Sequence, residues 1–430
     1  MSASTANIIS SMSFRSSSNS NWSDLPSDVM ELILQKLTLM DYLKCREICQ
    51  SWQNMVRDAL STKGKCPPKP HFPFIIEPTR TIPFLVNPIN GKYYSFATEL
   101  NYGLSLERFI GEETLCSQKT NIQHYVNVFT SVEGWLIIQD YFNARRWKEK
   151  DRFFGLICFY NPVSKAMIKL PTLCFTAFED DAYESSKVVM SSKPDCKDSI
   201  IVILLYQYWT DYKLFFCKVR GLPWTKIETQ HCGDIGFSDI AIHGSKLYAI
   251  TNVGCSEYVV VFNLSNPNAV TSERIVMVQD PKEQGFTFPH WEIEDCAYEK
   301  SFLLMDSTSG DLFIVHCMLR YDEDFENWPL KFAVYKLDKS VPRWLKIERF
   351  DDKILLLDDK GIQFISTTNL DGPCMESIQT NCVYFTLTTQ ISKEIFNDIG
   401  VFTLSDKKIQ WLECSLAYKV GSVWFTPSLW

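Results

Sequence analysis

Short apolar segments bounded by turn residues recur along the chain from about residue 82 to its C-terminus. Segments of roughly four to eight residues, separated by Gly, Pro, Asn and Asp, are typical of β-strands and turns. Residues 82–86 and 92–97, for example, flank the turn sequence Asn-Pro-Ile-Asn-Gly. We find no long helix in this part of the sequence. The pattern therefore predicts a body built mainly of β-sheet.

A loose repeat runs through this body. Each copy consists of a strand, a turn, a second strand and then a Trp or a Leu-Pro pair, as in residues 159–171 and 334–344. The copies are roughly 50 to 70 residues apart, close to the spacing of kelch repeats, so about 350 residues would make six or seven blades. This predicts a kelch-like β-propeller, with two stacked β-sandwich domains as the alternative. Because an open ring leaves strand edges unpaired, residues 423–426 are expected to pair with strands near residues 82–86.

Residues 22–53 have a helical pattern instead. Leu25 and Pro26 open it, Ser27 is a candidate N-cap, and Thr38 with Asp41 fits a second capping signature. The first helical run places its apolar residues at spacings of three and four; they are Val29, Leu32, Ile33 and Leu37. The apolar residues of the second run are Leu39, Leu43, Ile48, Trp52, Met55 and Val56.

The helical unit has more apolar positions than one inward face can use. A unit of about 40 residues is too small to bury a self-sufficient core. Yet a short stretch contains six leucines, which are Leu25, Leu32, Leu34, Leu37, Leu39 and Leu43. Some of these side chains must therefore face a partner. The alternative is a three-helix cap that packs on the following domain.

The same residues resemble an F-box. The resemblance rests on Leu25-Pro26, Ile33-Leu34, Leu37, Asp41, Leu43, Arg46, Ile48-Cys49 and Trp52. Ile48 stands where Val is usual, and Gln53 stands where Arg is usual. The resemblance implies a three-helix domain that docks on the adaptor subunit of an SCF-type ubiquitin ligase, and through it on a cullin. The residues expected to bind the adaptor are Leu25, Pro26, Ile33, Leu34, Leu37, Leu39 and Leu43.

The body resembles the kelch-like C-terminal domain of unknown function found in plant F-box proteins. The resemblance rests on Asn161-Pro162 followed by Leu170-Pro171, on Asp239-Ile240-Ala241, and on residues 421–428. It implies a plant source and no particular substrate. The predicted fold is thus mainly β with a small N-terminal α domain. Its parts are a Ser-rich disordered tail (1–21), the F-box (22–62), a Pro-rich linker (63–81) and the propeller (82–430). A transit peptide is the alternative for the tail, although the tail has only one Arg.

Composition argues against several classes of protein. The net charge of −8 argues against a nucleic-acid-binding protein, which is usually basic. No apolar run reaches the roughly 18 residues of a membrane span. The 15 cysteines lack the spacing of a disulfide framework and no signal peptide is visible, so reduced thiols in the nucleus or cytoplasm are expected.

Sequence motifs for catalysis or cofactor binding are missing. The chain contains no C-x-x-C, no G-x-S-x-G and no phosphate-binding glycine loop. His316 and Cys317 are adjacent, so in a strand they would point to opposite faces. We therefore predict no catalytic residue, no metal site and no cofactor.

Two charged segments are predicted loops. Residues 140–152 are basic and contain Trp147, whereas residues 320–329 are acidic and contain Trp328. Because loops carry binding residues and aromatic side chains anchor interfaces, Trp147 and Trp328 are the predicted substrate contacts. Two unrelated solvated loops are the alternative.

Taken as one protein, the sequence predicts a non-catalytic ligase subunit whose F-box docks on the adaptor and whose body binds a protein substrate. One alternative is an F-box protein that regulates its partners outside a ligase. Another is a propeller enzyme or a carbohydrate-binding protein whose helical start is incidental.

Overall fold

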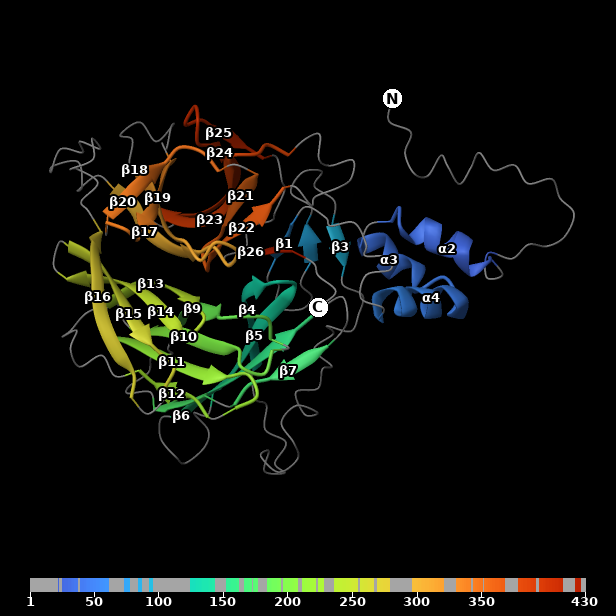
Figure 1. Cartoon of the computed structure of the whole chain (residues 1–430), viewed down its shortest axis with the longest axis horizontal. Helices are drawn as coiled ribbons and strands as arrows, with labels where there is room; N and C mark the ends of the chain where they lie inside the picture. Colours follow the sequence, from blue (N-terminus) through green and yellow to red (C-terminus); the bar gives the residue numbers. More distant parts are fainter. Residues whose placement is uncertain are drawn as a thin grey trace, which may run out of the picture. The chain divides into compact units, whose positions relative to one another are not determined.

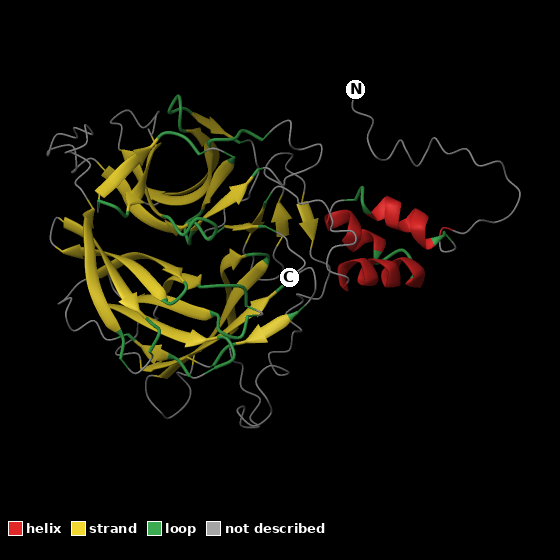
Figure 2. Ribbon diagram, in the orientation of Figure 1, coloured by secondary structure: helices red, strands yellow, loops and turns green. Residues whose placement is uncertain are grey.

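The structure is a computed structural model of the whole chain. It describes residues 22, 25–37, 39–61, 73–77, 84–86, 93–95, 124–143, 152–161, 166–171, 173–176, 184–194, 196–207, 211–221, 223–227, 236–253, 256–266, 269–278, 296–320, 330–341, 343–350, 352–367, 378–391, 394–412 and 422–426. The chain divides into two compact units, Met1–His71 and Phe72–Trp430. The first is helical and the second is built of strands (Figures 1 and 2).

The described part of the first unit contains three helices, α2 (Ser27–Leu34), α3 (Leu39–Cys45) and α4 (Gln50–Ser61). Their buried side chains form one small core of Met30, Leu34, Tyr42, Cys45, Trp52 and Val56. Pro26, not Ser27, occupies the N-cap of α2, and no side chain bonds the end of the helix. The predicted capping role of Ser27 is therefore wrong. A turn at residues 46–49 splits the predicted second run into α3 and α4. No described helix has the length and apolar character to cross a bilayer.

The described strands of the second unit form six sheets. Sheet 1 contains β1 (Phe74–Glu77), β2 (Phe84–Val86), β3 (Tyr93–Ser95) and β26 (Val423–Phe425). Sheet 2 contains β4 (His124–Val132), β5 (Trp135–Asn143), β6 (Arg152–Tyr160), β7 (Met167–Lys169) and β8 (Leu173–Thr176). Sheet 3 contains β9 (Glu184–Met190), β10 (Ile200–Gln207), β11 (Asp211–Lys218) and β12 (Thr225–Lys226).

The last three sheets follow in chain order. Sheet 4 contains β13 (Gly236–His243), β14 (Lys246–Val253), β15 (Ser256–Asn263) and β16 (Thr271–Val278). Sheet 5 contains β17 (Cys296–Met305), β18 (Leu312–Arg320), β19 (Leu330–Asp338) and β20 (Arg343–Ile347). Sheet 6 contains β21 (Lys353–Leu357), β22 (Ile362–Ser366), β23 (Cys382–Ile391), β24 (Glu394–Thr403) and β25 (Ile409–Trp411).

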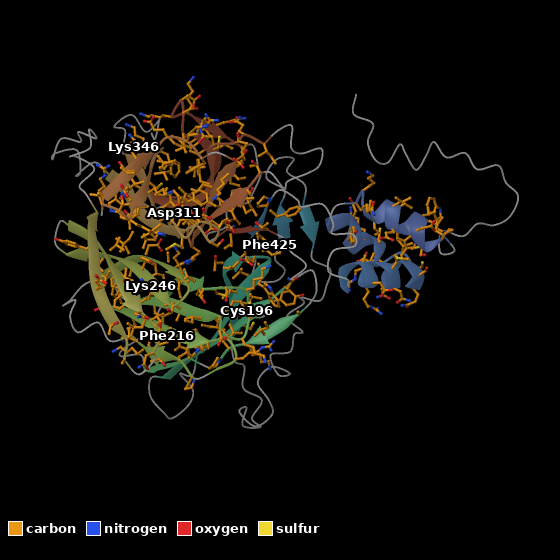
Figure 3. All side chains as sticks on the ribbon, in the orientation of Figure 1. Cys196, Phe216, Lys246, Asp311, Lys346 and Phe425 are labelled. Atoms are coloured by element: carbon orange, nitrogen blue, oxygen red, sulfur yellow. The ribbon has the colours of Figure 1, made fainter. Side chains whose placement is uncertain are left out.

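The sheets are arranged around a common axis. One edge strand of each sheet contacts the corresponding strand of the next: β26 contacts β4, β4 contacts β9, β9 contacts β13, β13 contacts β17, and β17 contacts β22. Going around this ring reproduces the order of the chain (Figure 1). Buried side chains such as Phe216 in sheet 3 and Phe425 in β26 fill the space beside the strands (Figure 3). This arrangement is a β-propeller, as the sequence predicts.

The two ends of the body meet in sheet 1. β26 pairs antiparallel with β1, and Trp424 lies opposite Ile75. The predicted pairing of residues 423–426 with the start of the body is therefore confirmed, but the direct partner is β1 and not β2 at residues 84–86. β1 lies inside the range 63–81 that we predicted as a linker. Pro73 and Pro78 bracket four residues, Phe-Ile-Ile-Glu, and Pro at a strand boundary is compatible with a strand.

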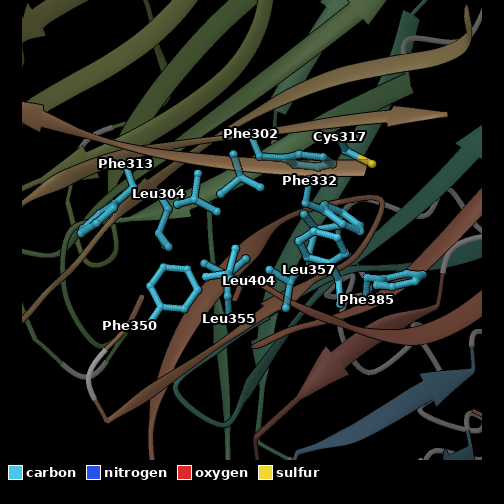
Figure 4. Close-up of a cluster of buried hydrophobic side chains, with 14 of the residues drawn as sticks. Phe302, Leu304, Phe313, Cys317, Phe332, Phe350, Leu355, Leu357, Phe385 and Leu404 are labelled. Carbon is cyan, nitrogen blue, oxygen red and sulfur yellow. The ribbon is translucent and has the colours of Figure 1, made fainter. Parts of the chain in front are cut away.

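Sheet 6 departs from the simple up-and-down order. Its strand order is β22-β21-β23-β24-β25, and β21 and β23 pair in parallel. Residues 354–357 of β21 are all buried, as is usual for strands in parallel pairs. Sheets 5 and 6 share the core shown in Figure 4, where Phe332 lies 5.1 Å, ring centre to ring centre, from both Phe385 and Phe402. The parallel pair β21–β23 therefore packs into this large aromatic core.

Short turns from neighbouring sheets touch one another on one face of the ring. The Glu133 and Lys193 side chains, from the β4–β5 and β9–β10 turns, lie 3.5 Å apart. Gly310 in the β17–β18 turn has φ +68°, and a Cβ there would lie 3.3 Å from the His243 ring in the β13–β14 turn. Lys339, in the β19–β20 turn, donates to the Gly310 carbonyl at 2.6 Å. We call this side of the ring the turn face. The connections from second to third strand must lie on the opposite face.

Candidate functional site

The α2 helix carries apolar side chains that the first unit leaves uncovered. Val29 and Leu32 are three positions apart, so they share one side of the helix, and they are 38% and 61% exposed. Met30 and Leu34, four positions apart on another side, are buried in the core of the unit. α2 is therefore apolar on two sides, and one of them is available to a partner.

Two more exposed apolar side chains lie outside α2. Ile48, in the turn between α3 and α4, is 58% exposed, and Trp22 is 57% exposed. The Trp22 carbonyl accepts a hydrogen bond of 3.1 Å from the Trp52 indole, which ties it to α4. We call Trp22, Val29, Leu32 and Ile48 the exposed apolar set. Contiguous exposed apolar side chains mark protein-docking surfaces, and within this set Val29 and Leu32 are neighbours on α2.

The seven predicted adaptor-binding residues differ in exposure. Pro26 is exposed, whereas Leu25, Ile33 and Leu37 are half-buried against the core. Leu34 is 0% exposed, so its prediction as a contact residue is corrected: it supports α2 from inside the unit. The side chains of Leu39 and Leu43 lie outside the described residues. Trp52, a candidate core residue in the sequence pattern, is buried.

The sequence prediction omitted Val29, Leu32 and Ile48 from the contact residues. The sequence analysis placed Val29 and Leu32 on one helical face with Ile33 and Leu37. Spacings of three and four show that residues share a face, but not whether that face points to the core or to solvent. A second apolar stripe on the same helix, formed by Met30 and Leu34, was the signal in the sequence that could have identified the exposed face. Two apolar stripes on one short helix indicate that one of them faces outward.

A buried ion pair lies at the axis of the propeller. Lys187 Nζ of β9 is 2.6 Å from Asp239 Oδ2 of β13, and these side chains are 8% and 3% exposed. The same Asp239 oxygen accepts the Leu303 backbone N–H of β17 at 2.5 Å, and Lys187 donates to the Leu303 carbonyl at 3.2 Å. Burial lowers the pKa of Lys187, although Asp239 acts in the opposite direction. Both charges are thus used to join sheets 3, 4 and 5. Asp239 is the acid of the Asp239-Ile240-Ala241 motif.

In the described part of the chain, Ser301 and His316 form a pair whose residue types could act as nucleophile and base. Ser301 Oγ and His316 Nδ1 are 2.9 Å apart on adjacent strands. Both residues are buried, at 4% and 5% exposure, and burial lowers the pKa of His316 to about 4. A substrate cannot reach such a pair without the sheets separating. Cys317 packs in the core on the other side of the sheet, as predicted from its adjacency to His316.

The described residues form no metal site, and two of their cysteines, Cys217 and Cys317, are buried, whereas Cys196 is exposed. No three His, Cys, Asp or Glu side chains in the described part of the chain lie close enough to hold a metal ion. Burial raises the pKa of the Cys217 thiol to about 12 and also raises that of Cys317. A protonated thiol is a poor nucleophile, so neither cysteine is suited to accept ubiquitin.

The two predicted substrate-binding residues, Trp147 and Trp328, lie outside the described residues. The strands beside them are described. β5 and β18 are each the second strand of their sheet and begin at the turn face, so both end at the opposite face. The described strands β5 and β18 therefore end on the same face of the ring, at Asn143 and Arg320.

Comparison with known proteins agrees with both units. An F-box domain model matches residues 22–63, and a KIB1-4 β-propeller model matches residues 106–403. β1–β3 and β26 extend the propeller beyond that range on both sides.

Curated relatives from Arabidopsis thaliana match along most of their length. The F-box protein At1g10110 is 21% identical, covering 83% of this chain and 83% of its own. The F-box protein At1g69090 is 21% identical, covering 95% and 92%. The F-box protein At2g26160 is 23% identical, covering 85% and 95%. The chain belongs to the F-box proteins that carry a C-terminal KIB1-4 β-propeller.

Proposed function

We propose that this protein is the substrate-recognition subunit of an SCF-type cullin-RING ubiquitin ligase. The observation that carries the proposal is the exposed apolar set of the F-box unit, because an F-box implies binding to a Skp1-type adaptor. The remaining described chain is a much longer ring that exposes three large apolar side chains, Val341, Leu345 and Trp411. The F-box unit thus offers the docking surface for the ligase, and the body is left to hold a target.

In this role the protein performs no covalent step. The adaptor connects the F-box to a cullin, and the body holds the target near the ubiquitin-loaded enzyme, which raises the effective concentration of the target there. F-box proteins are typically non-catalytic. Such a subunit acts in the nucleus or cytoplasm.

We further infer that the target binds the face opposite the turn face. Taking each sheet as one blade gives a ring of six, in which sheets 2 and 5 lie on opposite sides of the axis. The basic segment with Trp147 follows β5 of sheet 2, and the acidic segment with Trp328 follows β18 of sheet 5. A target with separate acidic and basic patches matches this charge distribution.

The adaptor interface is tested by replacing exposed residues of the F-box unit. We expect Leu32→Ala and Ile48→Ala, and the double variant Leu25→Ala/Pro26→Ala, each to weaken binding to a Skp1-type adaptor. Truncating an interface anchor commonly costs about 2 kcal/mol, which is roughly thirtyfold in Kd. Trp411→Ala is the matched control, because Trp411 is 50% exposed but belongs to the propeller. Isothermal titration calorimetry measures Kd, and circular dichroism verifies folding.

The outcomes separate the proposed function from its alternatives. Folded F-box variants that all bind the adaptor like the wild type would refute the interface. Adaptor binding without recruitment of a cullin would favour a regulatory F-box protein that works outside a ligase. A chain that binds no adaptor but binds a carbohydrate or turns over a substrate would be the propeller protein of the third alternative.

A further inference from the structure

The last strand of the ring is held by very few backbone contacts. β26 has three residues, and among the described strands it pairs with β1 alone, through three residue pairs. It lies at the end of its sheet nearest the axis. A pairing of this length is at the lower limit of strands in folded proteins. Contacts other than the β26–β1 ladder must therefore help to hold the end of the chain.

Trp424, the central residue of β26, supplies those contacts. Its backbone N–H donates to Asp358 Oδ2 at 3.0 Å, and its indole Nε1 donates to the Leu357 carbonyl at 2.8 Å. On the other side, Ser131 Oγ of β4 donates to the Trp424 carbonyl at 2.7 Å. All three bonds are buried. Trp424 is therefore joined to sheet 6 and to sheet 2 as well as to its own sheet.

Asp358 also accepts hydrogen bonds within its own turn. Its Oδ1 atom accepts the backbone N–H groups of Lys360 and Gly361 at 2.8 and 2.7 Å, which closes the tight turn between β21 and β22. Burial raises the pKa of Asp358 to about 6, so above neutral pH the group is a carboxylate that can only accept hydrogen bonds. One oxygen atom thus serves the turn and the other serves β26.

The turn that carries Asp358 is itself anchored at the axis. Lys300 Nζ of β17 donates to the Asp359 carbonyl at 2.7 Å. A Cβ at Gly361 would lie 3.6 Å from the Thr130 hydroxyl of β4. The turn therefore meets strands of sheets 1, 2 and 5 while belonging to sheet 6. Its position does not depend on β26 alone.

We propose that Asp358 is a latch for the ring: it holds the C-terminal strand from the axis, and without its bond to Trp424 the strand β26 opens locally while the other sheets stay closed. The latch is distinct from the adaptor and target surfaces. It makes β26 a unit that opens at a lower free energy than the rest of the body.

Asp358→Asn tests the latch with little other disturbance. The amide oxygen of Asn can still accept the two turn N–H groups, but its NH₂ group then faces the Trp424 N–H, so a donor meets a donor. At pH 8, hydrogen–deuterium exchange of the full chain should become at least roughly tenfold faster in β26 and in β1. Exchange in β9–β20 should not change. β1 is the informative readout, because Asp358 does not bond to it in the structure.

Asp306→Asn is the matched control. Asp306 also closes a turn, between β17 and β18, where it accepts the Thr308 N–H at 3.0 Å and the Ser309 hydroxyl at 2.9 Å. It pairs in addition with Lys353 of β21 and does not bond to β26, so the variant disturbs sheet 6 without removing the bond to Trp424. This variant should leave exchange in β26 and β1 unchanged. Ser131→Ala, which removes the bond from sheet 2, should accelerate the same two strands by a smaller factor and serves if Asp358→Asn does not fold. Unchanged exchange in β26 and β1, or equal acceleration in all sheets, would overturn the latch.

Discussion

The two units of this protein differ in how much of their apolar surface is exposed. Seven large apolar side chains are exposed in the described part of the chain. Four of them, Trp22, Val29, Leu32 and Ile48, belong to the small F-box unit; three, Val341, Leu345 and Trp411, belong to the much longer body. A short three-helix unit is too small to bury all of its apolar residues. A ring of sheets has no such limit, because each sheet is covered by its neighbours.

The two units therefore differ in what covers their apolar surface. In the proposed function the F-box unit is completed by another protein, whereas the body is completed by its own strand β26. A change at the axis or at the closure should therefore lower the stability of the body and leave adaptor binding intact. A change in the exposed apolar set should have the reverse effect.

Removing residues 423–430 should have the largest effect on the body. Trp424 is 0% exposed and packs with Ile75, Leu356 and Tyr384 between sheets 1 and 6. Truncating a buried Trp alone costs about 3–5 kcal/mol, a large part of the stability of a typical domain. We expect the shortened body to fold but to melt at a markedly lower temperature, as followed by circular dichroism, with adaptor binding retained. A truncated chain that melts like the wild type would show that β26 does not close the ring.

Breaking the axial ion pair should have the next largest effect. Lys187→Met leaves the Asp239 charge buried without its partner, which typically costs about 3–5 kcal/mol. Lys187→Met/Asp239→Asn removes the charge and keeps an acceptor for the Leu303 N–H, so it should recover most of this loss. Urea unfolding of the three proteins measures the free energies. A single variant as stable as the wild type, or a double variant no better than the single, would contradict the role of the pair.

A smaller effect is expected from His316 as the pH falls. Burial lowers its pKa from 6.5 to about 4, so the unfolded chain takes up this proton before the folded chain does. The stability contributed by neutral His316 is complete above pH 6.5 and is lost as pH falls towards 4, by roughly 3 kcal/mol in total. His316→Gln should remove this part of the pH dependence of the free energy of unfolding. Parallel pH profiles for the two proteins would show that His316 does not contribute it.

The sequence pattern predicted much of the body because strand and turn signals are local. Residues 82–86 and 92–97 correspond to β2 and β3, and the closing strand was placed from its apolar residues. β1 was missed because only four residues separate Pro73 from Pro78 and the prolines dominated the interpretation. The parallel pairing of β21 with β23 leaves no mark on either strand, since strand order depends on contacts between distant segments.

The candidate sites were predictable to different degrees. The F-box pattern identified the docking unit, yet it could not tell which stripe of α2 faces outward, and so included Leu34 and omitted Leu32. The Lys187–Asp239 pair joins residues that are 52 positions apart and has no sequence signature. Periodicity cannot show on which face of the ring the strands before Trp147 and Trp328 end. The strand topology does show this, because it places the ends of β5 and β18 on one face.

Affinity purification with two baits tests the central claim most directly. One bait is the full-length chain, and the other lacks residues 22–53. We expect ligase subunits to be captured only by the full-length chain. A protein target should be captured by both baits and should accumulate on the shortened one, because it is bound but no longer degraded. Trp147→Ala and Trp328→Ala in the shortened bait should then reduce capture of that target. The account is contradicted if the full-length chain captures no ligase subunit, or if every specific partner is lost together with residues 22–53.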